Sequence, residues 1–247
     1  MNFKDHFSLH ARDYLRYRPR YPKTLFAYLA SLCPEHHTCW DCATGNGQAA
    51  LSLTQHFDLV IATDASADQI AHAFDHPQID YRNVPAENSE IWEHTIDLVT
   101  IAQALHWFNF EQFYAEVRRV LKPGGIIAAW TYELLNISPE IDAIVNHFYN
   151  EVVGEFWPPE RSFVEKKYQS LPFPFDDIDP PEFTMTRDWG LLELLGYINT
   201  WSATQRFIRT NNENPLKALE KKLLPAWGDP DVKKHVVWPL YLRVGRI

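Results

Sequence analysis

The chain lacks the features that mark secreted, membrane-spanning and nucleic-acid-binding proteins. Its three cysteines are an odd number in one short segment, which does not make a disulfide framework. No apolar run is long enough to cross a bilayer, and the polar segment 1–6 is unlike a signal peptide. Lysine and arginine number 23 against 32 aspartates and glutamates, and the resulting net charge of −9 argues against a nucleic-acid partner. We therefore predict a soluble, cytoplasmic protein with no membrane partner.

Metal-binding patterns are also scarce, although Cys39 and Cys42 have the spacing of a ligand pair. Both lie on a predicted strand, where side chains three positions apart point to opposite faces. No second Cys/His pair follows at a zinc-like distance. The pattern predicts buried cysteines that act as small apolar residues, and no metal ligands.

What the chain does have is the alternation of short apolar runs and amphipathic stretches that is typical of a parallel α/β sheet. Its 247 residues fit one domain, 1–247. The less regular segments 1–24, 155–181 and 189–230 are predicted to form a helical and aromatic cap, because sites in open sheets lie beyond the carboxyl ends of the strands. The predicted strands are 39–42, 59–63, 79–84, 97–102, 125–130, 183–189 and 235–244.

The segment around Gly45 and Gly47 is the most informative one. A strand, a tight loop, a helix, a second strand and then Asp64 follow one another, which is the order that builds a nucleotide-binding crevice. The two glycines tolerate positive φ, and the helix after them points its N–H groups at a ligand. Asp64 is placed to accept hydrogen bonds from ribose hydroxyls. The same spacing fits an NAD-binding fingerprint or a plain strand-to-helix turn, so the loop alone does not decide.

Asp41, just before the loop, weighs against the NAD alternative. Its carboxylate would repel a pyrophosphate, whereas it would attract a cationic sulfonium cofactor with an ammonium group. The chain also contains no Tyr-x-x-x-Lys pair, which short-chain dehydrogenases need. An NAD-binding oxidoreductase therefore stays as the alternative to a sulfonium-dependent enzyme.

At this point the chain resembles the class I S-adenosylmethionine-dependent methyltransferases, in particular a small-molecule subgroup that includes trans-aconitate methyltransferase. The resemblance implies a Rossmann-like, seven-stranded, mostly parallel sheet with an antiparallel last strand. One departure is Ala43, where the family usually has glycine, so a cofactor-binding protein without turnover is a further alternative. The segments that carry the resemblance are 14–22, 41–50, 64–66, 85–87, 97–108, 121–125 and 200–203.

The resemblance implies roles for particular residues toward the cofactor. Asp64 would hold the ribose, Ala86 and Glu87 would lie against the adenine, and Gln103 would meet the ammonium group through its backbone carbonyl. Arg18 would close an N-terminal lid over the cofactor carboxylate. The residues expected to bind S-adenosylmethionine are Tyr14, Arg18, Asp41, Ala43, Gly45, Gly47, Asp64, Ala65, Ala86, Glu87, Gln103 and Trp107.

For the acceptor side, His106 is the candidate catalytic residue, either as a general base or as a packing residue beneath Trp107. Tyr17, Tyr132 and Trp201 are expected to line the acceptor pocket. Arg187 and Arg206 are further candidates for recognising an anionic acceptor. The expected reaction is methyl transfer to a small molecule, most plausibly to an oxygen of an organic acid, by a monomer or homodimer.

Overall fold

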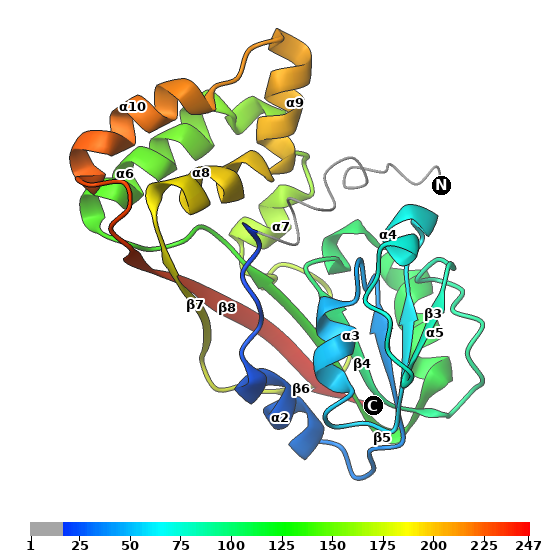
Figure 1. Ribbon diagram of the computed structural model, residues 1–247. Coiled ribbons are helices and arrows are strands. Elements are labelled where there is room, and N and C mark those ends of the chain that lie inside the picture. The colour runs from blue at the N-terminus through cyan, green and yellow to red at the C-terminus, as the bar shows by residue number, and fades with distance from the viewer. Residues whose placement is uncertain (1–16) are drawn as a thin grey trace.

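The structure, a computed structural model, describes residues 17–247 and is built on one sheet of eight strands (Figure 1). The strand order is β3-β2-β1-β4-β5-β8-β6, and β7 also pairs with β8. The first five strands run parallel, and β6, β7 and β8 are antiparallel to their partners. The strands are β1 (Thr38–Cys42), β2 (Leu59–Thr63), β3 (Ile79–Arg82), β4 (Ile96–Ala102), β5 (Leu121–Tyr132), β6 (Asp176–Ile178), β7 (Phe183–Trp189) and β8 (Lys234–Arg246).

This architecture confirms a Rossmann-like, mostly parallel α/β sheet, but the predicted number of seven strands is wrong. The additional strand is β6, which lies in the proline- and aromatic-rich segment 155–181 and has no buried residue. It is a strand because Asp176–Ile178 pairs with residues 244–246 at the end of β8. No local sequence pattern predicts this long-range pairing. Because β6 and β7 both pair antiparallel with β8, they run in the same direction as β1–β5, and the predicted antiparallel last strand, β8, is confirmed.

Helices cover both faces of the parallel strands. On one face, α2 (Lys23–Ser31) and α3 (Gln48–Leu53) bury apolar side chains in the cluster that contains Trp130. On the other face, α5 (Phe110–Val120) packs Phe113, Val117 and Val120 against the cluster around Trp40. The short helix α4 (Ala67–Ala71) follows β2, and Ser66 caps it by accepting the Gln69 N–H at 3.3 Å, as its capping sequence predicts.

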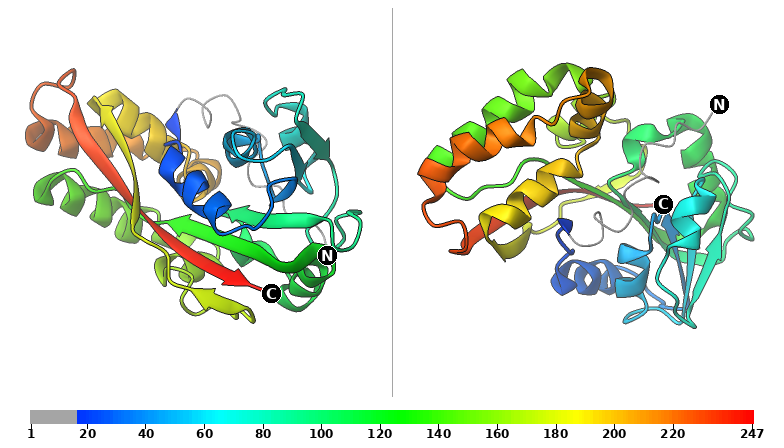
Figure 2. Two further views of the ribbon diagram at one scale, coloured as in Figure 1. Left: turned by 90° about the horizontal axis from the view of Figure 1, so that it is seen from below. Right: turned by 45° about the horizontal axis from the view of Figure 1, so that its top comes forward.

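A second group of helices lies beyond the carboxyl end of β5 and beside β8 (Figures 1 and 2). We call this group the cap. Its helices lie in the predicted cap segments 155–181 and 189–230 and also in residues 139–154, which precede them. The cap consists of α6 (Pro139–His147), the π-helix η3 (Phe148–Val152), η4 (Gly154–Phe156), α7 (Arg161–Glu165), α8 (Leu191–Asn199), α9 (Ser202–Asn211) and α10 (Leu216–Trp227).

Cys39 and Cys42 lie on opposite faces of β1, as the strand pattern predicts. Both are fully buried, Cys39 in the cluster of Trp130 and Cys42 in the cluster of Trp40. Burial raises the pKa of both thiols well above the ordinary value, so they stay protonated. Across the described part of the chain, none of the helices has the length and apolarity that crossing a bilayer requires.

Candidate active site

The loop between β1 and α3 has an unusual backbone. Gly45 and Gly47 have φ of +58° and +84°, in the left-handed region that only glycine adopts without strain. Ala43, where the related family usually has glycine, also has a positive φ, of +53°. A Cβ added at Gly47 would overlap the Tyr81 hydroxyl from β3. The loop therefore needs glycine at position 47 for space as well as for conformation.

Asp41 lies at the end of β1, directly beneath this loop. Its carboxylate is buried and accepts hydrogen bonds from the Thr44 hydroxyl at 2.5 Å and the Thr100 hydroxyl at 2.7 Å. Burial raises the pKa of Asp41 to about 6, and the two hydroxyl groups offset part of that rise. A cation close to this carboxylate would therefore stabilise its ionised form.

Asp64, at the end of β2, holds the loop from the other side. Its Oδ2 accepts the Gly45 N–H at 2.9 Å, and its Oδ1 accepts the Ser66 N–H at 2.8 Å. The carboxylate thus sits where β2 ends and the glycine loop turns. This is the position in which a dinucleotide- or nucleoside-type cofactor places its ribose.

The residues around the loop fit S-adenosylmethionine. The Tyr81 hydroxyl is buried above Gly47 and has no hydrogen-bond partner among residues 17–247, so the site contains an unsatisfied polar group. Asp41 supplies a negative charge for a cationic amino-acid end, and Asp64 supplies acceptors for ribose hydroxyls. This donor set agrees with a sulfonium nucleoside better than with a pyrophosphate.

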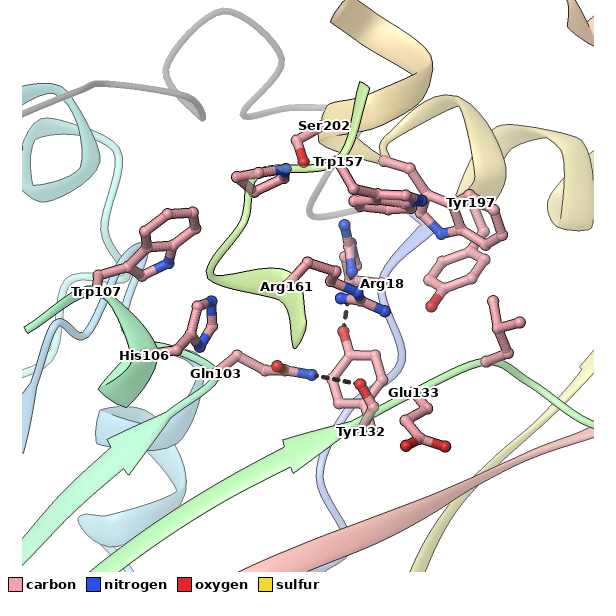
Figure 3. Close-up of a pocket in the computed structure, with 13 residues that line it drawn as sticks. Arg18, Gln103, His106, Trp107, Tyr132, Glu133, Trp157, Arg161, Tyr197 and Ser202 are labelled. Carbon is pink, nitrogen blue, oxygen red and sulfur yellow. Dashed lines mark hydrogen bonds between the residues drawn. The ribbon is translucent and has the colours of Figure 1, made fainter. Parts of the chain in front are cut away.

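A cavity opens between the carboxyl ends of β4 and β5 and the cap (Figure 3). Its empty volume is about 720 Å³ when the open solvent in its mouth is included. Six of its residues were predicted for the site from sequence: Arg18, Gln103, His106, Trp107, Tyr132 and Trp201.

Arg18 and Gln103 are held at the cavity by Tyr132 (Figure 3). The Arg18 Nη1 donates to the Tyr132 hydroxyl at 3.0 Å, and the Gln103 Nε2 donates to the Tyr132 carbonyl at 3.2 Å. The Arg18 guanidinium also lies over the Tyr197 ring, 5.2 Å from its centroid. Gln103 adopts a φ of +58°, which bends the chain directly after β4. The end of β5 therefore connects the N-terminal segment with the loop that follows β4.

Arg161, at the start of α7, brings a second guanidinium to the cavity. Its Nε donates to the Tyr149 hydroxyl at 2.8 Å, and its charged group lies 4.7 Å from the centroid of a Trp157 ring. Within residues 17–247, no carboxylate forms an ion pair with Arg161. The guanidinium is thus fixed in place while its terminal nitrogens keep their hydrogen-bonding capacity.

His106 lies in the short helix η2 (Leu105–Trp107), which follows β4, and it lines the same cavity. Its ring is 4.7 Å from that of Trp107, and its Nδ1 is 2.8 Å from the Tyr168 hydroxyl. Burial and then the charge of Arg161 lower the pKa of His106 to about 3. The imidazole is consequently neutral at physiological pH.

Of the other predicted residues, those within 17–247 are not part of the cavity lining. Tyr14 falls outside the described residues. Tyr17 packs on α8, where a Cβ at Gly196 would overlap its ring. Glu87 accepts the backbone N–H of Asn109 at 3.0 Å, so in this structure it supports the start of α5. The expected cofactor contacts of Ala65, an exposed residue after β2, and of buried Ala86 stay predictions.

Arg187 and Arg206, the two arginines predicted to bind an anionic acceptor, do not line the cavity. Arg187 lies on β7 opposite Val236, and Arg206 donates from α9 to the Phe156 carbonyl at 3.2 Å. The cavity is instead lined by residues that the sequence did not single out. These are Glu133, Leu134, Trp157, Pro158, Arg161, Tyr197 and Ser202. The aromatic content of segment 155–181 is the one signal that pointed to part of this set.

Fold and site together define an α/β enzyme with a nucleoside-type cofactor, and comparisons with known proteins narrow the class. The family described as "Methyltransferase domain" matches residues 40–129. A provisionally named methyltransferase of Dictyostelium discoideum is 30% identical over 97% of this chain and 94% of its own length. The structure of a provisionally named type II methyltransferase of Anaeromyxobacter dehalogenans is 40% identical, covers 93% of this chain and 97% of its own, and superposes with a TM-score of 0.88.

The chain belongs to the class I S-adenosylmethionine-dependent methyltransferases. A provisionally named methyltransferase from an antibiotic biosynthesis pathway of Anabaena variabilis has the same fold at 16% identity, with a TM-score of 0.54 over 89% of this chain and 98% of its own. Membership in the family excludes the NAD-binding oxidoreductase that the glycine loop alone left open. It makes this protein a methyltransferase, and its fold implies S-adenosylmethionine as the cofactor.

Proposed function

We propose that this enzyme transfers the methyl group of S-adenosylmethionine to a carboxylate oxygen of a small organic acid, bound in the cavity between the sheet and the cap. In this proposal, the cofactor lies on the loop at Gly45 and Gly47, between Asp41 and Asp64. When bound, the cofactor supplies an electrophilic methyl group on a positively charged sulfur. The cavity supplies the acceptor's position and its shelter from water.

One observation carries the choice of an acid. Arg161 presents a guanidinium to the cavity without a carboxylate partner among residues 17–247, and Tyr149 and Trp157 hold it in one orientation. A fixed guanidinium binds a carboxylate through two parallel hydrogen bonds. Arg18 adds a second positive charge to the lining, whereas Glu133 is its one carboxylate. Burial raises the pKa of Glu133, although the charges of Lys167 and Arg161 oppose this.

An acid acceptor also suits the chemistry of the cavity. A carboxylate is already deprotonated at neutral pH, so its attack on the methyl group requires no general base. The aromatic side chains of Trp107, Trp157 and Trp201 line the cavity and limit the access of water. Alignment of the acceptor oxygen with the methyl group is then the main task of the protein.

The test is a screen of small mono-, di- and tricarboxylic acids, with their amides and alcohols as matched compounds, in which release of S-adenosylhomocysteine is measured. We expect saturable turnover with at least one acid and none with its amide. Arg161→Met is expected to raise KM for that acid by about ten- to a hundredfold, the effect of one charge-assisted contact. Lys166→Met, an exposed residue after the same helix, is the control and should change little.

Turnover of amines or neutral alcohols in preference to acids would overturn the choice of acceptor, as would an Arg161→Met enzyme with unchanged KM. The remaining partners are proposals of the same kind. The net charge of −9 supports the absence of a nucleic-acid partner. A monomer or homodimer, and a cytoplasmic location, stay predictions that gel filtration and cell fractionation address.

A further inference from the structure

His106 and Tyr168 form a buried pair beside the cavity. The Tyr168 hydroxyl lies 2.8 Å from the His106 Nδ1, and the Tyr168 side chain is completely buried between α7 and β6. A distance alone does not say which group donates, because a neutral imidazole carries its proton on one nitrogen or the other. The surroundings of the hydroxyl decide this.

Within the described residues, the Tyr168 hydroxyl forms a 2.8 Å hydrogen bond with the His106 Nδ1, and the Thr131 hydroxyl is a second polar neighbour whose contact opposes the rise in the pKa of Tyr168. The Thr131 hydroxyl uses its own hydrogen to donate to the Gln103 Oε1 at 2.8 Å. Burial raises the pKa of Tyr168 above its ordinary value, so the hydroxyl keeps its hydrogen. A buried hydroxyl that donated to nothing would be destabilising. The 2.8 Å contact makes Nδ1 the expected acceptor of the Tyr168 hydrogen.

This arrangement determines the other ring nitrogen. An Nδ1 that accepts a hydrogen bond carries no proton, so the neutral imidazole has its proton on Nε2. Nε2 has no hydrogen-bond partner among residues 17–247, and His106 lines the cavity (Figure 3). Arg161 lowers the pKa of His106 through its charge, which places the guanidinium within electrostatic reach of the ring. An N–H group and a guanidinium thus face one cavity from two different elements.

We propose that His106 is a hydrogen-bond donor to the acceptor through its Nε2–H, and that Tyr168 is the positioning residue that holds this tautomer. Its extension to a carboxylate acceptor, with Arg161 and His106 contacting the same anion, rests on the proposed function. His106 is then no general base, because its lone pair is used by Tyr168. The enzyme would bind an acceptor oxygen that is already deprotonated.

The first experiment needs no acceptor. Nitrogen-15 NMR of the histidine side chains reports which ring nitrogen carries the proton, and His106→Gln identifies the signals of His106 by their loss. We expect a protonated Nε2 and an unprotonated Nδ1 for His106 across the neutral pH range. Tyr168→Phe should convert this pattern into a mixture of the two tautomers. A protonated Nδ1 in the wild type, as would follow if Tyr168 donated to Thr131, overturns the proposal.

The second experiment uses the acid found in the screen and compares two substitutions of His106. Glutamine offers an N–H at nearly the position of Nε2, whereas leucine offers none. As a donor, His106→Gln should keep kcat/KM within about tenfold of wild type, and His106→Leu should lose about ten- to a hundredfold, mostly in KM. A general base would instead give equal, large losses in kcat for both variants, together with a pH profile that follows a histidine.

The two experiments separate the failure of this inference from the failure of the proposed function. If no acid is methylated but the NMR pattern is as expected, the tautomer stands and the acceptor class is wrong. If an acid is methylated and the NMR pattern is reversed, the acceptor class stands and the role of His106 is wrong. If Tyr168→Phe does not fold, the spectrum of the wild type still shows which ring nitrogen of His106 carries the proton.

Discussion

At the residue scale, the protonation of Asp41 is linked to the binding of a cofactor beside it. Its pKa of about 6, raised by burial, leaves the carboxyl partly protonated just below neutral pH. In the protein without ligand, protonated Asp41 favours the folded state, and this contribution is lost as pH rises through about 6. A ligand with an ammonium group near Asp41 favours the ionised form, so its binding has the opposite dependence on pH.

We expect S-adenosylhomocysteine to bind about tenfold more weakly at pH 5 than at pH 7, because below pH 6 binding must release the Asp41 proton. Calorimetry in two buffers of different ionisation enthalpy would measure this release. In Asp41→Asn, the release should disappear and the affinity should become nearly independent of pH over this range. Equal proton release by wild type and Asp41→Asn would place the titrating group elsewhere.

The second residue-scale prediction concerns Asp64. Asp64→Ala removes the acceptor of the Gly45 N–H along with the proposed ribose acceptor, so it should weaken binding of S-adenosylhomocysteine by at least about tenfold. Asp68→Ala, a half-buried acidic residue one turn away on α4, is the matched control. Calorimetry on both variants compares them directly. Unchanged affinity in Asp64→Ala would show that Asp64 does not contact the cofactor ribose.

Ala43 gives a prediction about stability. An alanine at a φ of +53° is strained by roughly 1–2 kcal/mol, of which glycine would relieve most while adding some entropy to the unfolded chain. Ala43→Gly should therefore raise the free energy of unfolding by up to about 1 kcal/mol. Ala49→Gly, a buried helical position in α3, should lower it instead. Urea unfolding of the two variants checks the contrast, and a destabilised Ala43→Gly would contradict it.

At the scale of elements, the Asp97 carboxylate connects the starts of the strands β1, β4 and β5 through hydrogen bonds. Asp97, near the start of β4, accepts the backbone N–H groups of His37 and Thr38 at 2.9 Å each. Its other oxygen accepts from the Lys122 Nζ at 2.7 Å, on β5. Because Asp97 is buried, its loss would leave the two backbone N–H groups without this acceptor and Lys122 with Glu35, 3.0 Å away, in place of two carboxylates. The parallel strands β1, β4 and β5 are held in register partly by this contact.

Asp97→Ala is accordingly expected to lower the free energy of unfolding by about 3–5 kcal/mol. Asp58→Ala removes an exposed carboxylate that contacts His37, and it should change the free energy of unfolding by less than about 1 kcal/mol. Urea unfolding followed by circular dichroism measures both. A loss of less than about 1 kcal/mol for Asp97→Ala would mean that water replaces the carboxylate at no cost.

The elements that the sequence predicted well are those with local signals. The parallel strands and the loop at Gly45 both follow from patterns within a few residues. The strand β6 and the side chains of Arg161 and Tyr168 depend instead on contacts with distant parts of the chain. The strands and the loop proposed to hold the cofactor could therefore be predicted from sequence, whereas the lining of the cavity required the packed structure.

At the scale of the whole molecule, β8 joins the cap to the sheet. It pairs with β5 over Ile126–Tyr132 and with β7 over Phe183–Trp189, and five alternate residues along it are buried: Val236, Trp238, Leu240, Leu242 and Val244. We expect the sheet and the cap to unfold together because they share this strand. Tryptophan fluorescence and far-ultraviolet circular dichroism should give coincident urea transitions. Two separate transitions would mean that the cap is an independent folding unit.

The pairing of β5 with β8 has an evolutionary consequence. The chain leaves β5 after Tyr132 and returns beside it on β8, with Tyr132 opposite Leu240 and a bridge between Asn136 and Val237. The segment 133–233 between them contributes β6 and β7 to the sheet only as partners of β8. The two ends of this segment are thus adjacent, and the glycine loop lies outside it. Natural selection can exchange such a segment as a cassette, altering which acceptor is methylated while the cofactor half is inherited unchanged. A chimaera carrying a relative's 137–233 equivalent should follow the donor's acceptor preference.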